Sequence, residues 1–162
     1  MEKESTEMPK VIILQGLPGS GKSTWAKEQC SLDNRTKRIT KDDLRAMLGG
    51  DYSKGLENLV KATRDFIIKQ AMMLGYETII IDDTNFHPSH ISDITAIVEA
   101  KVPANYSVEI LEFECPVEIC IQRDAQRNGK AHVGAKVIRQ MQKMKETYEH
   151  ISYPNKSVFR AY

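Results

Sequence analysis

Residues 16–24 read Gly-Leu-Pro-Gly-Ser-Gly-Lys-Ser-Thr, and this stretch decides the fold class of the chain. It matches the pattern G-x-x-x-x-G-K-[ST], with Gly16, Gly21, Lys22 and Ser23 at the fixed positions. An apolar, mostly β-branched run at 11–14 precedes it, and residues 23–28 can open a helix. In a strand, glycine loop and helix of this kind, backbone N–H groups and the helix N-terminus hold phosphate oxygens. The stretch therefore predicts binding of a nucleoside triphosphate.

The residue types in this loop each suit a phosphate site. Glycines let the backbone adopt positive φ and approach the phosphates without a Cβ in the way. Lys22 supplies positive charge to the β- and γ-phosphates, and the Ser23 hydroxyl can coordinate Mg²⁺. We expect ATP as donor and Mg²⁺ as cofactor, bound by Gly16, Pro18, Gly19, Ser20, Gly21, Lys22, Ser23 and Thr24.

Composition indicates one globular α/β domain. The chain has 162 residues, 41% of them hydrophobic and 28% charged, and its net charge of +1 gives no overall basic field for nucleic acid or membrane. Its apolar runs are too short to span a membrane, and residues 1–10 lack the pattern of a signal peptide. Three cysteines without metal-binding spacing suit reduced thiols. We predict a cytoplasmic protein with a disordered polar lead-in at 1–9 and a single domain, which contains the P-loop, at 10–162.

Strands and helices alternate along the chain. Strands are expected at about 11–15, 37–40, 78–81 and 107–113, with an edge strand at 157–159, and helices at 23–30, 42–49, 56–74, 88–98, 116–129 and 134–149. This order predicts a P-loop NTPase fold, a single domain in which helices cover both faces of a central parallel sheet and a small lid is added. Ligands of such sheets bind at the carboxyl ends of the strands.

Two of the helices show an apolar face. In the helix at 56–74, the positions expected to face the core are Leu56, Leu59, Val60, Thr63, Ile67, Ala71 and Leu74. In the last helix, they are Val137, Met141, Met144 and Tyr148. Trp25, one turn into the first helix, is expected to pack in the core rather than stack on a base.

Acidic residues follow the strand at 78–81, which ends on Asp82-Asp83-Thr84-Asn85. An acid at this place in P-loop proteins reaches Mg²⁺ directly or through water. The other acid can cap the following turn. We favour Asp83 for the site.

Asp42 lies 20 residues beyond Lys22, just after a predicted strand. Phosphoryl transfer to an alcohol needs a carboxylate that orients the hydroxyl and takes its proton, and Asp42 suits that role. Arg45, three residues on, falls on the same helical face. The alternative is an N-cap acid in a helical ion pair.

Basic residues gather in the last third of the chain. Arg123 and Arg127 precede Asn128-Gly129-Lys130, and such a pair on a mobile lid suits charge neutralisation on the transferring phosphate. The alternative is a helix C-terminus with cations that suit its dipole. A basic stripe at Lys136, Arg139 and Lys143 either contacts phosphates or is only solvated.

Together these motifs resemble the kinase module of the phage polynucleotide 5′-kinase family, which occurs in bifunctional end-healing enzymes that also carry a 3′-phosphatase. The resemblance covers about residues 11–148. It is carried by GLPGSGKSTW at 16–25, KDDLR at 41–45, DTN at 83–85, and R-x-x-x-R at 123 and 127 with a basic helix after it. No D-x-D-G-[TS] phosphatase motif is present, so no phosphatase activity is expected.

The resemblance implies transfer of the γ-phosphate of ATP to the 5′-hydroxyl of DNA or RNA. It implies Asp42 as general base, Arg45 on the acceptor phosphate, and Lys22 with the lid residue Arg127 on the donor. Arg123 is expected to bind ATP as the partner of Arg127. The acceptor side is completed by Asp83, Thr84, Asn85 and Arg139.

Two other functions remain compatible with these motifs. One is a nucleoside, nucleotide or other small-metabolite kinase of the same fold. The other is a nucleotide-dependent switch that binds partners. Guanine-specific switches carry N-K-x-D, whereas Asn155-Lys156-Ser157-Val158 lacks the Asp, which counts against a switch.

Overall fold

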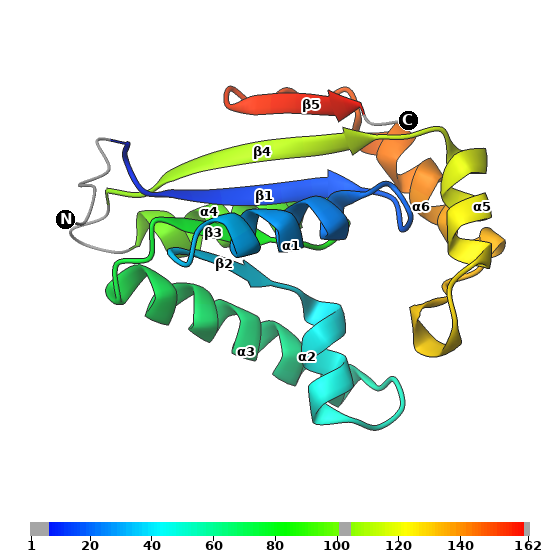
Figure 1. Ribbon diagram of the computed structural model, residues 1–162, viewed down its shortest axis with the longest axis horizontal. Coiled ribbons are helices and arrows are strands. Elements are labelled where there is room, and N and C mark those ends of the chain that lie inside the picture. The colour runs from blue at the N-terminus through cyan, green and yellow to red at the C-terminus, as the bar shows by residue number, and fades with distance from the viewer. Residues whose placement is uncertain (1–6, 101–104, 161–162) are drawn as a thin grey trace.

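The computed structural model describes residues 7–100 and 105–160 (Figure 1). Its elements are β1 (Lys10–Gly16), α1 (Lys22–Leu32), β2 (Thr36–Ile39), α2 (Lys41–Leu48), α3 (Lys54–Met73), β3 (Thr78–Ile81), α4 (Pro88–Glu99), β4 (Ser107–Glu114), α5 (Val117–Ala125), the 3₁₀ helix η1 (Gly129–Ala131), α6 (Ala135–Tyr148) and β5 (Lys156–Arg160). The predicted lead-in falls mainly on residues 1–6, outside the described residues.

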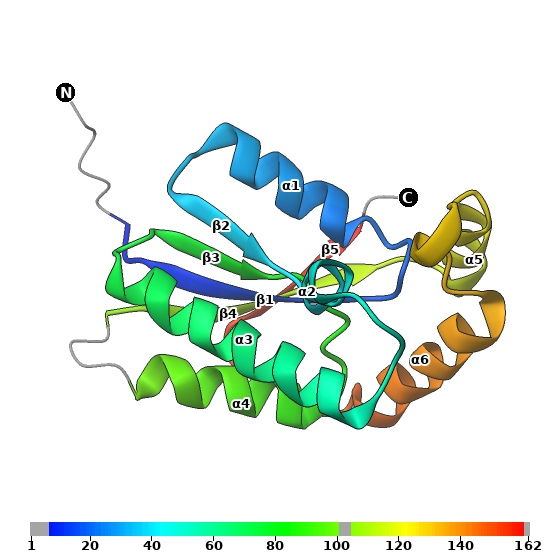
Figure 2. The same ribbon diagram turned by 90° about the horizontal axis from the view of Figure 1, so that it is seen from below.

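The five strands form one parallel sheet in the order β2-β3-β1-β4-β5. β1, which leads into the P-loop, is central, and β5 forms an edge as predicted. Figure 2 shows α1 over one face of the sheet and α3 and α4 over the other. The predicted α/β architecture, with helices on both faces of a parallel sheet, is confirmed. In the part of the chain that the structure describes, no helix is both long and apolar enough to cross a membrane.

The side chains of β1 alternate between the two faces of the sheet, which explains why a hydrophobic core lies on each face. Val11 and Ile13 face the larger core with α3 and α4, whereas Ile12 and Leu14 face the core under α1. Because side chains of a strand alternate between faces, a run of four apolar residues supplies both cores. Trp25 packs against Phe113 with ring centroids 5.7 Å apart, in agreement with the prediction that it is a core residue.

The predicted core face of α3 was partly wrong. Leu59 and Leu74 are 51% and 74% exposed, whereas Arg64 is only 1% exposed. The buried stripe runs through Val60, Arg64, Ile68, Ala71 and Met72. Apolar residues on both sides of this stripe blur the helical period, so the sequence pattern did not fix which face meets the sheet.

The last two helices also differ from the prediction. In α6, Val137 and Met144 are 38% and 42% exposed, while Ile138 is fully buried and Met141 packs beside it. This helix buries only a narrow stripe because it rests on α5 and the P-loop end rather than on the sheet. α5 ends at Ala125, not at Gly129, and an exposed segment follows it.

Candidate active site

The P-loop joins β1 to α1 and has the shape of an anion cradle. Gly19 and Gly21 adopt φ of 84° and 97°, and Gly21 is the N-cap of α1. A Cβ on Gly19 would lie 2.6 Å from the carbonyl oxygen of Cys120, so only glycine fits there. The Ser20 hydroxyl oxygen is buried and has no hydrogen-bond partner among the described residues. The loop therefore fits the phosphates of ATP, and the neighbouring Ser23 hydroxyl fits Mg²⁺.

Lys22 lies at the centre of the site, with only 8% of its surface exposed. Its Nζ is 3.4 Å from the carbonyl oxygen of Leu17. Burial lowers the pKa of Lys22, the negative charges of Asp82, Asp83 and Asp42 oppose this effect, and Arg127 adds to it. Charged groups from β3, α2 and the segment after α5 thus converge on the P-loop lysine. The sequence had assigned three of them, Asp42, Asp83 and Arg127, to the site.

Asp82 and Asp83 directly follow β3, and their carboxylates have different surroundings. Asp82 is 2% exposed, and its Oδ2 accepts a hydrogen bond from Arg38 Nε at 2.7 Å. Asp83 Oδ1 accepts the backbone N–H of Lys41 at 3.0 Å, and burial raises the pKa of Asp83 to about 6. Asp82 Oδ1 and Asp83 Oδ2 are buried without a hydrogen-bond partner in the described chain. Two free carboxylate oxygens beside a P-loop suit Mg²⁺, directly or through water.

Asn85 joins the ends of β3 and β1. Its side chain is fully buried, its φ is 51°, and its Nδ2 donates to the carbonyl oxygen of Leu14 at 2.8 Å. Gln15 Nε2 donates in return to the carbonyl oxygen of Asn85 at 3.0 Å. Thr84 contributes its carbonyl oxygen to the N–H of Gly16 at 3.3 Å. Asn85 and Thr84 therefore hold the ends of β3 and β1 together beneath the site in this structure.

Asp42 and Arg45 lie together at the start of α2. The side chain of Asp42 is 87% exposed, and its Oδ1 accepts from Arg45 Nη1 at 2.7 Å. Arg45 also binds Glu57 of α3 through Nε at 2.5 Å and Nη2 at 2.7 Å. The predicted helical ion pair thus exists, but the predicted N-cap role is wrong because Thr40 is the N-cap of α2. The carboxylate of Asp42 stays open to an acceptor. Glu57 was missed because nothing in the sequence links it to a residue 12 positions away.

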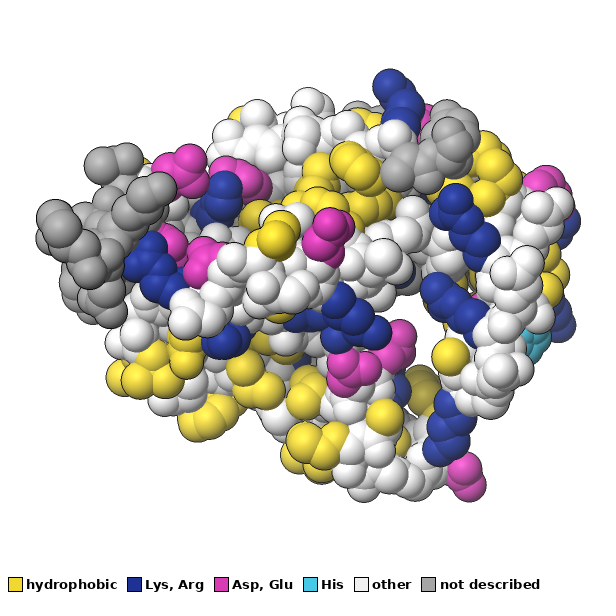
Figure 3. Space-filling view, viewed as in Figure 1, with side chains coloured by type: hydrophobic (Ala, Val, Ile, Leu, Met, Phe, Trp, Pro, Cys, Tyr) yellow, Lys and Arg dark blue, Asp and Glu magenta, His cyan; other side chains and the backbone are white. Residues whose placement is uncertain are grey.

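The two arginines that the sequence predicts for a lid differ in their contacts. Arg123 Nη1 donates to the carbonyl oxygen of Gly19 at 3.1 Å, which ties α5 to the P-loop. The side chain of Arg127 is 38% exposed and lies 4.0 Å from the buried carboxylate of Asp124. Residues 126–132 are all exposed. Figure 3 shows a hollow between α2 and the segment after α5, with basic and acidic side chains along its edge.

The basic stripe of α6 lies on an exposed face. Arg139 Nη2 pairs with Glu118 of α5 at 2.8 Å, and both side chains are more than half exposed. Lys136 and Lys143 are exposed as well. Arg139 is therefore partly neutralised, which lowers its expected share of any acceptor phosphate contact.

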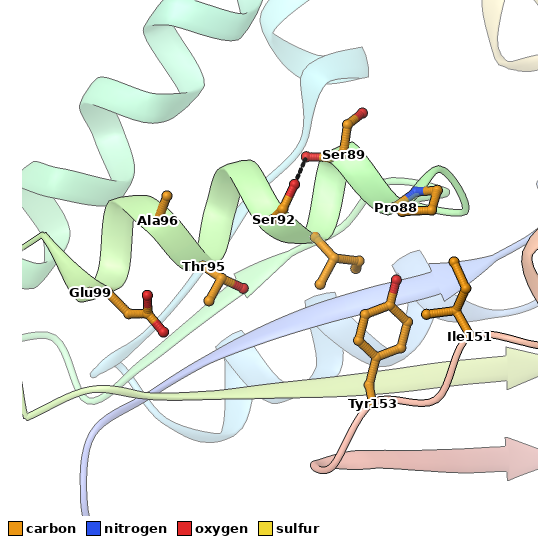
Figure 4. Close-up of a pocket in the computed structure, with 9 residues that line it drawn as sticks. Pro88, Ser89, Ser92, Thr95, Ala96, Glu99, Ile151 and Tyr153 are labelled. Carbon is orange, nitrogen blue, oxygen red and sulfur yellow. Dashed lines mark hydrogen bonds between the residues drawn. The ribbon is translucent and has the colours of Figure 1, made fainter.

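A second hollow of about 740 Å³ lies between α4 and the segment before β5 that carries Ile151 and Tyr153 (Figure 4). Its lining residues are Pro88, Ser89, Ile91, Ser92, Thr95, Ala96, Glu99, Ile151 and Tyr153. This set contains neither a Lys nor an Arg, so it offers no charge for a phosphate. The P-loop cleft is the better active-site candidate.

Known proteins resemble this chain in sequence and in fold. A family model described as "AAA domain" (AAA_33) matches residues 11–150. L-seryl-tRNA(Sec) kinase of Methanococcus maripaludis is 27% identical over 123 residues, which cover 74% of this chain and 47% of that protein. A chain in the structure of the Pnkp1/Rnl/Hen1 RNA repair complex matches with TM-score 0.75 and 24% identity over 92% of this chain and 48% of its own length. Kti12 of Chaetomium thermophilum in complex with ADP-AlF3 matches with TM-score 0.64 and 18% identity over 93% and 88% of the two chains. This chain spans about half the length of the first two.

Proposed function

The chain belongs to the AAA_33 family of P-loop kinases, and on this premise we propose that it transfers the γ-phosphate of ATP to the 5′-hydroxyl of a polynucleotide. The family uses ATP and Mg²⁺ in general, and the P-loop geometry fits both. What this proposal adds is the identity of the phosphate acceptor.

One observation carries the proposal: Asp42 at the start of α2 and Arg127 after α5 both lie near enough to the buried Lys22 for their charges to shift its pKa, Asp42 upward and Arg127 downward. Asp42 comes from the start of α2 and Arg127 from the segment after α5, on opposite sides of the hollow in Figure 3. A donor phosphate at Lys22 would therefore have a base on one side and a cation on the other. This arrangement suits in-line transfer to a hydroxyl held near Asp42.

In the proposed mechanism, Asp42 takes the proton of the attacking hydroxyl. Its exposure leaves it free to accept that proton, and the bond from Arg45 fixes its direction. Lys22 and Arg127 stabilise negative charge on the transferring phosphoryl group. Mg²⁺, held through Ser23 and through water by Asp83, would neutralise further charge on the donor phosphates.

The polynucleotide acceptor is supported by the placement of Arg45 next to the base. Glu57 anchors two of its nitrogens, so its side chain is held in one geometry beside Asp42. Asp42 and Glu57 partly neutralise Arg45, but their three hydrogen bonds leave two of its five N–H groups for the phosphate adjacent to the attacked hydroxyl. A free nucleoside lacks that phosphate and should be a poor acceptor.

A second candidate is phosphorylation of a hydroxyl carried by a charged tRNA. It is favoured by the 27% identity to a protein named L-seryl-tRNA(Sec) kinase. The same Asp42 would then serve a seryl hydroxyl instead of a ribose or deoxyribose 5′-hydroxyl.

An acceptor panel tests the proposal. We would compare γ-labelled phosphate transfer to 5′-hydroxyl DNA and RNA oligonucleotides, a 3′-phosphorylated nucleoside, a free nucleoside, a seryl-tRNA and a simple sugar. The proposal expects the highest kcat/KM for the oligonucleotides, with activity on the 3′-phosphorylated nucleoside. Transfer to the seryl-tRNA, the sugar or the free nucleoside in preference to the oligonucleotides would overturn it.

A further inference from the structure

The carboxylate of Asp124, near the end of α5, is buried, and each of its two oxygens accepts a backbone hydrogen bond. The residue is 1% exposed. Its Oδ1 accepts the backbone N–H of Val133 at 2.9 Å, and its Oδ2 accepts the N–H of Gly134 at 2.8 Å. His132 Nδ1 lies 3.2 Å from the same Oδ2. A buried charge is tolerated here because these N–H groups replace water.

The backbone of Asp124 holds the other end of the same segment. Its carbonyl oxygen accepts the N–H of Arg127 at 2.9 Å and lies 3.0 Å from His132 Nδ1. Because residues 126–132 are exposed, this segment buries little surface that would fix its path. Asp124 thus holds both ends of the loop that carries Arg127, one end through its carboxylate and the other through its backbone carbonyl oxygen.

Asp124 also sits at the N-terminus of α6. Gly134, the N-cap of this 14-residue helix, has no side chain that could accept the first N–H groups. A carboxylate at a helix N-terminus is favourable, and here it comes from α5 instead of from the helix itself. Burial acts to raise the pKa of Asp124, but the N–H groups of Gly134 and Val133, together with the nearby His132 and Arg127, hold the pKa below its usual value. The carboxylate is therefore charged at neutral pH.

The residue before Asp124 connects this arrangement to the P-loop. Arg123 donates to the carbonyl oxygen of Gly19. Gly19 packs so closely on Cys120, one turn earlier in α5, that no Cβ fits between them. These contacts fix α5 relative to the donor site. Asp124 in turn fixes the exposed loop relative to α5.

We propose that Asp124 is a positioning residue, which fixes the loop between α5 and α6 so that Arg127 is presented to the donor phosphates. This inference rests on the proposed role of Arg127 in phosphoryl transfer, and it does not depend on which acceptor is used. A residue that only stabilised the fold would act independently of Arg127.

A double-mutant cycle separates the two roles. In Asp124→Asn, an NH₂ group replaces one carboxylate oxygen and faces an N–H donor, so the loop is released. We expect kcat to fall on the order of 10²-fold, as misplacement of a reacting group by about 1 Å does, with the ATP dissociation constant nearly unchanged. In an Arg127→Ala background, Asp124→Asn should cause almost no further loss in kcat. An independent, multiplicative loss in that background would overturn the proposal.

Glu146→Gln is the matched control, because this exposed acid on α6 accepts a hydrogen bond from Gln142 of the same helix at 3.1 Å. It should leave unchanged both kcat and the rate of hydrogen exchange of the Val133 and Gly134 backbone amides. Asp124→Asn should increase that exchange rate. If Asp124→Asn does not fold, Asp124→Glu, which keeps the charge but adds a methylene, is taken through the same cycle with the same criteria. All rates are measured with the best acceptor of the panel, so a failure of the polynucleotide proposal is seen in the wild-type protein and does not affect this test.

Discussion

Arg45 and Glu57 join α2 to α3 through two parallel hydrogen bonds, from Nε to Oε1 at 2.5 Å and from Nη2 to Oε2 at 2.7 Å. Since the third guanidinium nitrogen binds Asp42, this pair fixes the proposed acceptor cation and the proposed base together. Arg45 in turn lowers the pKa of Glu57, so the pair is charged at neutral pH. The acceptor side of the site is thus held by a residue outside every sequence motif.

Glu57→Gln should weaken acceptor binding. The variant removes a charge-assisted pair that is typically worth about 1.5–3 kcal/mol, so we expect the KM for an oligonucleotide to rise by about one to two orders of magnitude. The KM for ATP should hardly change. Asp93→Asn is the control, because it removes the surface pair with Lys61 between α3 and α4. An unchanged acceptor KM in Glu57→Gln, with ATP binding affected instead, would contradict this role.

Asp42→Asn should act on the chemical step. An amide cannot take the proton of the hydroxyl, so kcat should fall by about 10² to 10⁴-fold, while ATP binds normally. Asp43→Asn, at the next position, is the control: Asp43 pairs with Arg38 and its side chain is 69% exposed. Steady-state kinetics of both variants make the comparison. An equal loss of ATP affinity in Asp42→Asn would instead indicate a structural or metal-binding role.

Arg127→Ala should lower kcat much more than it weakens ATP binding, because the charge is needed on the transferring phosphate. Arg127→Lys should restore only part of the activity, since an ammonium lacks the planar fork that binds two phosphate oxygens. Lys130→Ala removes another exposed charge from the same segment and should have a small effect. Full activity of Arg127→Lys would show that a point charge is sufficient.

His90 should make stability depend on pH. Burial, together with the charges of Lys41, His87 and Arg64, lowers the pKa of His90 to about 4 from its usual 6.5. The unfolded chain therefore gains a proton on His90 below pH 6.5, while the folded chain resists this until about pH 4. The contribution of His90 to the free energy of unfolding is thus complete above pH 6.5 and is lost as pH falls toward 4.

Urea denaturation of the wild type and His90→Gln checks this sign. The free energy of unfolding of the wild type, relative to the variant, should fall between pH 7 and pH 5. The slope should stay below about 1.4 kcal/mol per pH unit, because His90 exchanges a single proton. A difference that is the same at both pH values would show that His90 titrates normally in the folded protein.

The parts of the fold and site that could be predicted lie in continuous stretches of sequence. The loop at 16–24 predicted the fold class because its glycines suit the backbone geometry of a P-loop. The apolar runs of β1 and β3 predicted the parallel sheet. Asp42 and Asp83 were singled out because each follows a strand end, and such ends meet at one edge of a parallel sheet.

What could not be predicted depends on contacts between distant segments. Glu57, Arg38 and Asp124 are ordinary charged residues in the sequence, and only the packing of α3, β2 and α6 gives each of them its partner. The buried face of α3 was misjudged for the same reason: Arg64 is buried beside Asp65, which accepts from its guanidinium at 2.8 Å, and helical periodicity assigns charged residues to solvent.

The central proposal, transfer to a 5′-hydroxyl, is tested most directly with two oligonucleotides of one sequence, one ending in a 5′-hydroxyl and one already carrying a 5′-phosphate. Each is incubated with γ-labelled ATP and Mg²⁺, and the labelled position is mapped by digestion to nucleotides. We predict label only on the first oligonucleotide and only at its 5′ end, with Asp42→Asn strongly reducing it. Equal labelling of both oligonucleotides, or no labelling of either under conditions in which a seryl-tRNA or a small metabolite is phosphorylated, would contradict the proposal.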